Sequence, residues 1–275
     1  MDQERALLRT LYRDDVLEHL RSVASVSPLR PLCALVAGSG WGGCVEGETV
    51  EEFTLARLHP SLCPGVPGHQ GILRLVRLPQ GHLLVVEGRL HLYEGYGLPE
   101  VLLPVTFAHF LGVQIVILTN ASGSLSPFLR PGSILVLSDQ IDWTFVPDCF
   151  PRAVFDEKLR YLALRGAWAC GLSALEGVYV GVLGPSFETK AEIQMLGFLG
   201  GHAVGMSTVK ESKWARGLGM KVLALSLVTN WGTGLSPFPL SHEEVLSLAE
   251  TQKPLLRTFL HHIVTEILHE NRCES

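Results

Sequence analysis

The strongest constraint on the fold is a set of short apolar segments in which hydrophobic and polar residues do not alternate. Each segment is rich in Val, Ile and Leu, and they span residues 32–37, 72–76, 82–87, 113–119, 133–138, 177–183 and 221–228. Such segments are typical of strands covered on both faces, because a strand with one solvated face would carry a polar residue at every second position. Helical spacing predicts the helices, at 3–24, 97–111, 154–171, 188–199, 208–218 and 241–270. This order of strands and helices predicts an α/β fold.

One domain spanning residues 1–275 is expected, with the helix at 3–24 packed on it. No internal repeat, low-complexity segment or linker rich in Gly, Ser and Pro divides the chain. The apolar stretch at 101–118 has the length of a membrane span, but a proline, a histidine and a glutamine interrupt it. We predict a helix through Leu111, then a buried strand through Thr119, and no membrane span.

Charge and cysteine usage narrow the class of protein. The net charge of −5 argues against a nucleic-acid partner, because binding to phosphate backbones needs clustered Lys and Arg. The six cysteines form no CxxC pair and have no histidine at zinc-finger spacing, so we expect reduced thiols and no metal site. The charged N-terminal segment is unlike a signal peptide. These features together predict a cytoplasmic location.

Polar, glycine-containing segments follow most of the predicted strands. They are GSGWGG at 38–43, GRLHLYEGY at 88–96, TNASG at 119–123, GPSFE at 184–188, GMSTVKES at 205–212 and TNWGTG at 229–234. Any one of them alone is most often a structural turn. In an open α/β sheet, however, ligands bind at the carboxyl ends of the strands, so six such segments together predict one shared binding site.

The glycine-rich loop contains Gly38, Gly40 and Gly43 in a GxGxxG pattern. A dinucleotide-dependent oxidoreductase would need a helix directly after this loop, and the following sequence, CVEGETVEEF, does not favour one. An anion-binding loop, with backbone amides and the Ser39 hydroxyl turned inward, is the simpler interpretation.

Further residues at these strand ends and helix starts suit a small polar ligand. In an extended segment Arg89, His91 and Tyr93 share a face, and the planar Arg fork suits phosphate oxygens. Glu188 is placed near a helix start, where the helix dipole alone could account for it. The Asn230 amide can donate and accept at once. His242 lies in a helix first turn that Ser241 and Glu244 are placed to cap, and the dipole there favours a neutral imidazole that can bind a hydroxyl.

Taken together, these segments resemble the trimeric purine nucleoside phosphorylase family over about residues 25–265. The matching segments follow the family's order: GSGWGG (38–43), VPGHQG (66–71), EGRLHLYEGY (87–96), TNASG (119–123), GPSFET (184–189), AVGMSTV (203–209), TN (229–230) and SHEEV (241–245). The resemblance implies an α/β/α sandwich on a mixed, partly barrel-like sheet. It also implies a homotrimer with active sites near subunit boundaries, and no cofactor, since inorganic phosphate is a co-substrate.

The resemblance assigns a role to each matching residue. Phosphate would be bound by Ser39, Arg89, His91, the backbone amide of Ala121 and Ser207, with His69 nearby. The nucleoside would be bound by Tyr93 and Met206 at the ribose, Phe187, Glu188 and Asn230 at the base, and His242 at the 5′-hydroxyl. The catalytic residues among these would be His91, Glu188 and Asn230.

The implied reaction is the phosphorolysis of inosine or guanosine to free base and ribose 1-phosphate, with the 2′-deoxy forms included, as in purine salvage. An oxocarbenium-like transition state leaves negative charge on the purine, and Asn230 can donate to N7, where that charge collects. An ionised Glu188 accepts from the N1–H of a 6-oxopurine and repels the N1 lone pair of adenine.

Two other functions of the same fold are disfavoured for this chain. A 5′-methylthio-nucleoside phosphorylase is disfavoured, because relatives that prefer 6-aminopurines commonly have Asp in place of Asn230 and because His242 suits a hydroxyl. A non-catalytic nucleoside or phosphate binder is disfavoured because a decayed site would be expected to lose Arg89, His91 or Glu188, which are present.

Five features depart from the family's pattern. Ser122 and Ser124 replace small residues in the family's Asn-Ala-Ala-Gly-Gly run. Trp41 replaces a smaller aliphatic residue in the glycine-rich loop, Lys210 replaces a proline, and Trp231 follows the base-reading asparagine. The segment at 139–155 is shorter than in many relatives, where it supplies a phenylalanine that covers the ribose of a neighbouring subunit. Phe150 is the candidate for that contact here.

Overall fold

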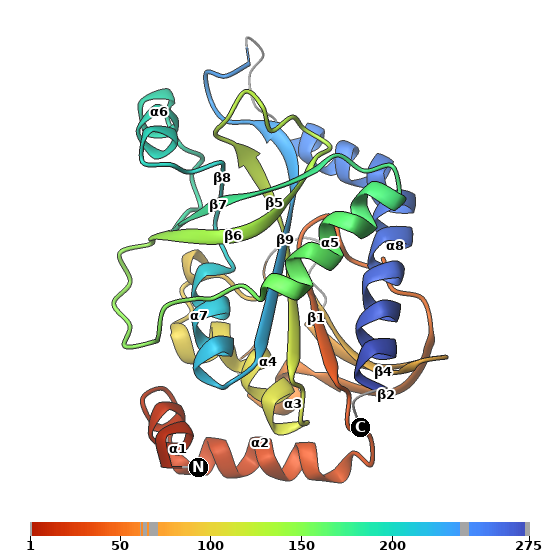
Figure 1. The fold of residues 1–275 in the computed structure, drawn as a ribbon. Helices are drawn as coiled ribbons and strands as arrows, with labels where there is room; N and C mark the ends of the chain where they lie inside the picture. The colour runs from red at the N-terminus through yellow and green to blue at the C-terminus, as the bar shows by residue number, and fades with distance from the viewer. Residues whose placement is uncertain (1, 61, 63–64, 66–70, 237–241, 273–275) are drawn as a thin grey trace.

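The computed structural model describes residues 2–60, 62, 65, 71–236 and 242–272, in which nine strands form one mixed sheet (Figure 1). The strands are β1 (Cys33–Ala37), β2 (Glu48–Thr54), β3 (Ile72–Leu78), β4 (Gly81–Glu87), β5 (Ile115–Ser124), β6 (Ile134–Trp143), β7 (Ala174–Val182), β8 (Ala203–Gly205) and β9 (Lys221–Trp231). Their order is β2-β3-β4-β1-β5-β8-β7-β6-β9, and β5 also pairs with β9. Five strands therefore close into a ring, which is the mixed, partly barrel-like sheet that was predicted.

Helices cover both faces of the sheet (Figure 1). Their bounds are α1 (Asp2–Arg9), α2 (Asp14–Val26), α3 (Leu55–Leu58), α4 (Leu98–Phe110), α5 (Glu157–Ala169), α6 (Lys190–Phe198), α7 (Val209–Gly217) and α8 (His242–Arg272). Helices α2, α4 and α7 lie on one face, and α5 and α8 lie on the other. The arrangement confirms the predicted α/β/α layering.

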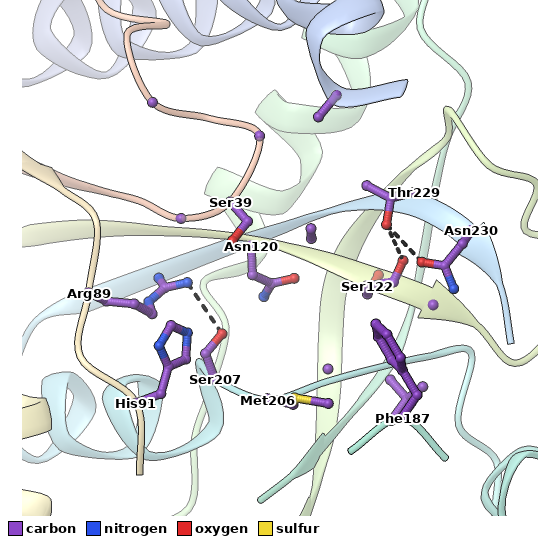
Figure 2. A pocket seen from close by; sticks show the side chains of 18 of the residues that line it. Ser39, Arg89, His91, Asn120, Ser122, Phe187, Met206, Ser207, Thr229 and Asn230 are labelled. Carbon is purple, nitrogen blue, oxygen red and sulfur yellow. Dashed lines mark hydrogen bonds between the residues drawn. The ribbon is translucent and has the colours of Figure 1, made fainter. Parts of the chain in front are cut away.

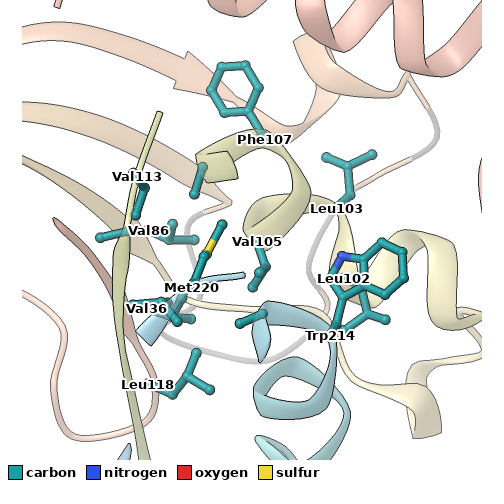
Figure 3. Packing of buried hydrophobic residues seen from close by; sticks show 14 of the residues in the cluster. Val36, Val86, Leu102, Leu103, Val105, Phe107, Val113, Leu118, Trp214 and Met220 are labelled. Atoms are coloured by element: carbon teal, nitrogen blue, oxygen red, sulfur yellow. The ribbon is translucent and has the colours of Figure 1, made fainter. Parts of the chain in front are cut away.

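Burial on both faces explains why the strand sequences do not alternate. In β1 every residue is buried, yet Ala34 and Val36 join one hydrophobic cluster whereas Cys33 and Leu35 join another. The first cluster continues between the sheet and helices α4 and α7, where residues such as Trp214 pack tightly (Figure 3). Each side chain of β1 thus faces one of the two helix layers, and none faces water.

The local predictions differ from the structure at several points: one predicted helix is divided, and β2, β8 and α3 were not predicted. The single helix expected at 3–24 is two helices, α1 and α2, because the chain turns at extended Arg13 so that both Leu8 and Leu17 reach the core. The Arg9 guanidinium, 2.8 Å from the Asp14 carboxylate, bridges the turn. Strand β2 was not predicted, because it is an edge strand whose residues are mostly exposed and polar and so give no apolar pattern.

The apolar stretch at 101–118 divides as expected. Its first part lies in α4 and its second part in β5, with the turn between them at Gly112 in the left-handed region (φ +89°). None of the helices in the described part of the chain has the length and hydropathy that a membrane crossing requires.

Candidate active site

A cavity of about 790 Å³ opens where the loops after β1 and β4 meet the distal parts of β5 and β9 and the segment before α7. It brings together the predicted residues Ser39, Arg89, His91, Tyr93, Ala121, Phe187, Glu188, Met206, Ser207 and Asn230. Figure 2 shows Arg89, His91, Ser39 and Ser207 at one end of the cavity and Phe187, Thr229 and Asn230 at the other. Segments far apart in the sequence therefore form one site with two chemically distinct ends.

Arg89 is the cationic centre of the first end. Its side chain is only 2% exposed, and its guanidinium donates to the Thr119 carbonyl at 2.7 Å and to the Ser207 hydroxyl at 3.3 Å. The Glu211 carboxylate lies 3.3 Å from Nε. A buried Arg with a balancing carboxylate remains charged and oriented, so it is suited to an anionic ligand beside Ser207.

The glycine-rich loop approaches Arg89 closely. A Cβ on Gly38 would lie 2.4 Å from the Thr119 carbonyl oxygen and 2.5 Å from the Arg89 guanidinium, so only glycine fits there. The Gly38 amide donates to the Thr119 hydroxyl at 3.1 Å. Ser39 follows at the cavity wall.

Trp41 anchors this loop and does not obstruct the cavity. Its side chain is fully buried in the second cluster, and its indole N–H donates to the Asn120 carbonyl at 2.8 Å. The bulkier residue at this position thus fixes the loop to β5.

Replacing Trp41 by alanine is expected to lower the free energy of unfolding by about 3–5 kcal/mol, because a large buried ring and a buried hydrogen bond are both lost. Urea unfolding followed by circular dichroism measures the effect. Trp168→Ala is the control, since that side chain is 84% exposed, and its effect should be below about 1 kcal/mol. Equal effects of the two substitutions would contradict the anchoring role.

His91 and Tyr93 occupy the cavity wall beside Arg89. The extended backbone predicted for 89–93 ends at His91, because Glu94 accepts from the His91 amide at 2.7 Å and from its ring at 3.0 Å and so closes a 3₁₀ turn at Leu92–Glu94. The two rings still share a face, stacked 4.7 Å apart. Glu94 was not predicted as a site residue, although it stands within the EGRLHLYEGY segment.

At the second end, Glu188 and Phe187 stand immediately before α6. Thr189 is the N-cap of this helix, so Glu188 lies near the helix start, as predicted, but directly before the cap and not within the helix as the range 188–199 implied. Burial is the largest cause of a raised pKa at the Glu188 carboxyl, and the Glu192 carboxylate adds to it. The Phe187 ring is half-exposed and lies open to a ligand at the cavity wall.

Asn230 is oriented by its neighbours. Its Oδ1 accepts from the Thr229 hydroxyl at 2.9 Å, and its Nδ2 donates to the Trp231 carbonyl at 3.0 Å. An amide nitrogen carries two protons, so one donor remains for a ligand in the cavity. The Trp231 backbone thus helps to orient the Asn230 amide.

A buried polar network beneath the cavity was not predicted. The Asn120 amide donates to the Thr208 hydroxyl at 2.7 Å, and the Ser226 hydroxyl contacts Asn120 Oδ1 at 2.5 Å and Ser122 Oγ at 2.6 Å. The network couples β5, β9 and the start of α7. The TNASG motif was the available signal, but only its Ala121 amide was assigned a role in the site.

Three predicted residues are not seen in the cavity. His69 lies outside the described residues, and His242 begins α8 but its side chain is outside the description. The Phe150 ring packs against Trp214 of its own chain, with centroids 4.9 Å apart.

In the same segment as Phe150, the Phe145 side chain is 78% exposed. Its backbone has a φ of +56°, and its ring lies edge-on to Trp143. Among the described residues, no three His, Cys, Asp or Glu side chains gather as metal ligands.

Comparisons with known proteins agree on one family. Residues 60–265 match the family model described as the Phosphorylase superfamily. Over 243 residues the chain is 39% identical to a purine nucleoside phosphorylase of Cellulomonas sp, and the match covers 82% of this chain and 84% of the relative. The solved structure of Schistosoma mansoni purine nucleoside phosphorylase in complex with inosine is 30% identical, with a TM-score of 0.80, and the match covers 92% of this chain and 96% of that chain. The complex of that protein with adenosine has a TM-score of 0.78 at the same identity and coverage.

Proposed function

Because the chain belongs to the phosphorylase superfamily and, within it, to the purine nucleoside phosphorylases, we propose that it is a pentosyltransferase that cleaves inosine and guanosine with inorganic phosphate. The products are the free base and ribose 1-phosphate, or deoxyribose 1-phosphate from the 2′-deoxy forms. Phosphate is a co-substrate in this proposal, and no cofactor takes part.

The two-ended cavity is the observation that carries this proposal. Arg89, Ser39 and Ser207 converge at one end, where an inorganic phosphate would sit with the Ala121 amide and His91 beside it. Asn230 and Phe187 stand at the other end. Glu188, which follows Phe187 in the sequence, also lines the cavity, and with Asn230 it would read a purine. Tyr93 and Met206 line the cavity too, where the ribose would link the two.

The proposed chemistry is displacement at C1′ with charge separation. Arg89 and the hydroxyls bind the anionic nucleophile and hold it near the sugar, so phosphate also stabilises the positive charge that develops there. The free Nδ2 proton of Asn230 would donate to N7 of the departing purine. This bond strengthens as the C–N bond breaks, so it acts mainly on the transition state.

Base selectivity would follow from the protonation state of Glu188. As a carboxylate it accepts from N1–H of hypoxanthine or guanine, which favours 6-oxopurines. The S. mansoni relative has been solved with inosine and also with adenosine, so selectivity must be measured for this chain.

We also propose a homotrimer in the cytoplasm. The exposed Phe145 side chain is a large apolar surface that a partner subunit would cover. Phe145 projects from the segment assigned to the neighbour's ribose contact, whereas Phe150 is held by Trp214, so Phe145 is the better candidate for that contact. The free cysteines among the described residues suit a reducing compartment.

The deciding experiment is release of free base from inosine, guanosine, adenosine and 5′-methylthioadenosine, each with and without phosphate. Turnover of inosine and guanosine alone, lost when phosphate is omitted, is the expected result. Efficient turnover of 5′-methylthioadenosine would replace the proposal with the methylthio-nucleoside reaction. Absence of turnover with all four substrates, together with nucleoside binding by calorimetry, would identify a non-catalytic binder.

A further inference from the structure

Four charged side chains gather next to the phosphate end of the cavity. They lie where the end of β6 and the segment after it meet the first turns of α7. The Lys210 ammonium lies 2.7 Å from Asp142 and 2.6 Å from Asp148. The Lys213 ammonium lies 3.3 Å from Asp142 and 2.6 Å from Asp148. Lys210 also donates to the Val146 carbonyl at 2.5 Å. We call these four residues the Lys–Asp cluster.

The cluster is too deeply buried to be a solvated surface pair. The Lys210 side chain is 5% exposed and the Asp148 side chain 4% exposed. Burial alone would raise the pKa of Asp148, but hydrogen bonds from Lys210 and Lys213 leave it below the usual value. Charges buried in this way persist only when each is paired, and loss of one partner is costly.

Neutral hydrogen bonds reinforce the same junction. The Gln140 amide donates to the Val209 carbonyl at 3.0 Å and accepts from the Ser212 hydroxyl at 2.7 Å. Because Gln140 lies in β6 and its partners lie in α7, the strand and the helix are tied at several points.

The helix that is held in this way carries the phosphate-binding groups. Directly before α7 stand Ser207 and Thr208, and Thr208 has a φ of +74°, a region that β-branched residues seldom adopt. Glu211 accepts from the Thr208 amide at 2.9 Å and faces Arg89. Lys210 and Glu211 are adjacent in the sequence. The first turn of α7 therefore contacts the Lys–Asp cluster through Lys210 and Arg89 through Glu211.

We propose that Lys210 is a positioning residue for phosphate: through the Lys–Asp cluster it fixes the start of α7, and with it Ser207 and the Glu211 that holds Arg89. The inference rests on the proposed function. Glu188 and Asn230 are supplied by other segments, before α6 and at the end of β9, so loss of the cluster should weaken phosphate binding selectively.

The test is steady-state kinetics of Lys210→Met, which keeps the unbranched stem of the side chain and removes its ammonium group. The KM for phosphate is expected to rise about tenfold, because small misplacements of binding groups carry large kinetic penalties, whereas the KM for inosine should change by less than about twofold. Arg160→Met is the control, since it removes an ion pair with Glu176, between α5 and β7. An equal rise in the phosphate KM of both variants would refute the proposal.

A double-mutant cycle with Ser207→Ala separates positioning from general destabilisation. If Lys210 acts through the start of α7, the two effects on the phosphate KM should be less than additive in free energy, because the second substitution removes a contact that is already lost. Strict additivity would refute the proposal. Should Lys210→Met fail to fold, Asp142→Asn, which removes one charge from a less buried partner, takes its place in the cycle.

Failure of the proposed function is distinguishable from failure of this inference. A wild-type protein without phosphorolytic activity would refute the function, and inorganic phosphate binding by calorimetry then tests the cluster. Wild type binding phosphate about tenfold more tightly than Lys210→Met would uphold the positioning role, and equal affinities would refute it.

Discussion

Replacing Asn230 by alanine is expected to lower kcat for inosine phosphorolysis by about 10²–10³-fold, the range typical of losing one donor to a charge that develops in the transition state. The KM for inosine should change little, because the bond to N7 is weak until the glycosidic bond breaks. Steady-state kinetics at saturating phosphate measures both constants. A fall in kcat of less than about tenfold would remove Asn230 from the leaving-group chemistry.

Thr229→Val is the matched variant for this prediction. It keeps the size of the side chain and removes the hydroxyl that lies 2.9 Å from Asn230 Oδ1. The amide is then less firmly oriented but still present, so kcat should fall by about tenfold or less. A loss as large as that of Asn230→Ala would show that the effect comes from disturbing β9 and not from the donor itself.

The layers of the fold were predictable because a strand that is buried on both faces has an uninterrupted run of apolar residues in its sequence. In β1, neighbouring residues face opposite hydrophobic clusters, so every position is apolar. Strand β2 has no such run, because its residues at the sheet edge face water. The closure of the sheet by pairing of β5 with β9 depends on contacts between distant segments, which no local pattern contains.

The site was predictable where function demands an unusual residue at a strand end. Arg89, Glu188 and Asn230 belong to such segments, and the structure brings all three to one cavity. The supporting residues were not predictable from local pattern. Asp148 and Lys210 are far apart in the sequence, and their contact exists only because the segment after β6 folds back onto α7.

The two ends of the cavity differ in how they are held, and this difference makes their contributions separable. The phosphate end depends on a helix start that is fixed by buried charges, Arg89 with Glu211 and Lys210 with Asp148. The purine end depends on neutral hydrogen bonds around Asn230 and on a half-buried carboxylate. Substitutions at one end should therefore leave the KM for the substrate bound at the other end nearly unaltered.

Replacing Glu188 by glutamine is expected to lower kcat/KM for inosine by about 100-fold, because a hydrogen bond to a charged group is replaced by one to a neutral amide. The amide can also turn its NH₂ toward the N1 lone pair of adenine. The ratio of inosine to adenosine turnover should therefore fall further than inosine turnover alone. Parallel assays with the two nucleosides measure the ratio, and an unchanged ratio would remove Glu188 from base selection.

The pH dependence gives an independent check on the same carboxyl. Burial raises the pKa of Glu188, so on acidification it takes up a proton at a higher pH than an exposed glutamate does. The protonated form presents a donor to N1–H, so kcat/KM for inosine should fall as the pH drops through that raised pKa. In Glu188→Gln this fall should disappear, because the amide does not titrate there.

Glu192→Gln is the control for the pH profile. It removes a nearby carboxylate that raises the Glu188 pKa, so the acidic fall in kcat/KM should move to lower pH. At neutral pH, kcat/KM for inosine should stay close to that of the wild type. Glu192 also caps the start of α6, where it accepts from Thr189, so thermal unfolding must be checked in parallel. A profile that Glu188→Gln leaves unchanged would assign the acidic fall to another group and would separate the raised pKa from base recognition.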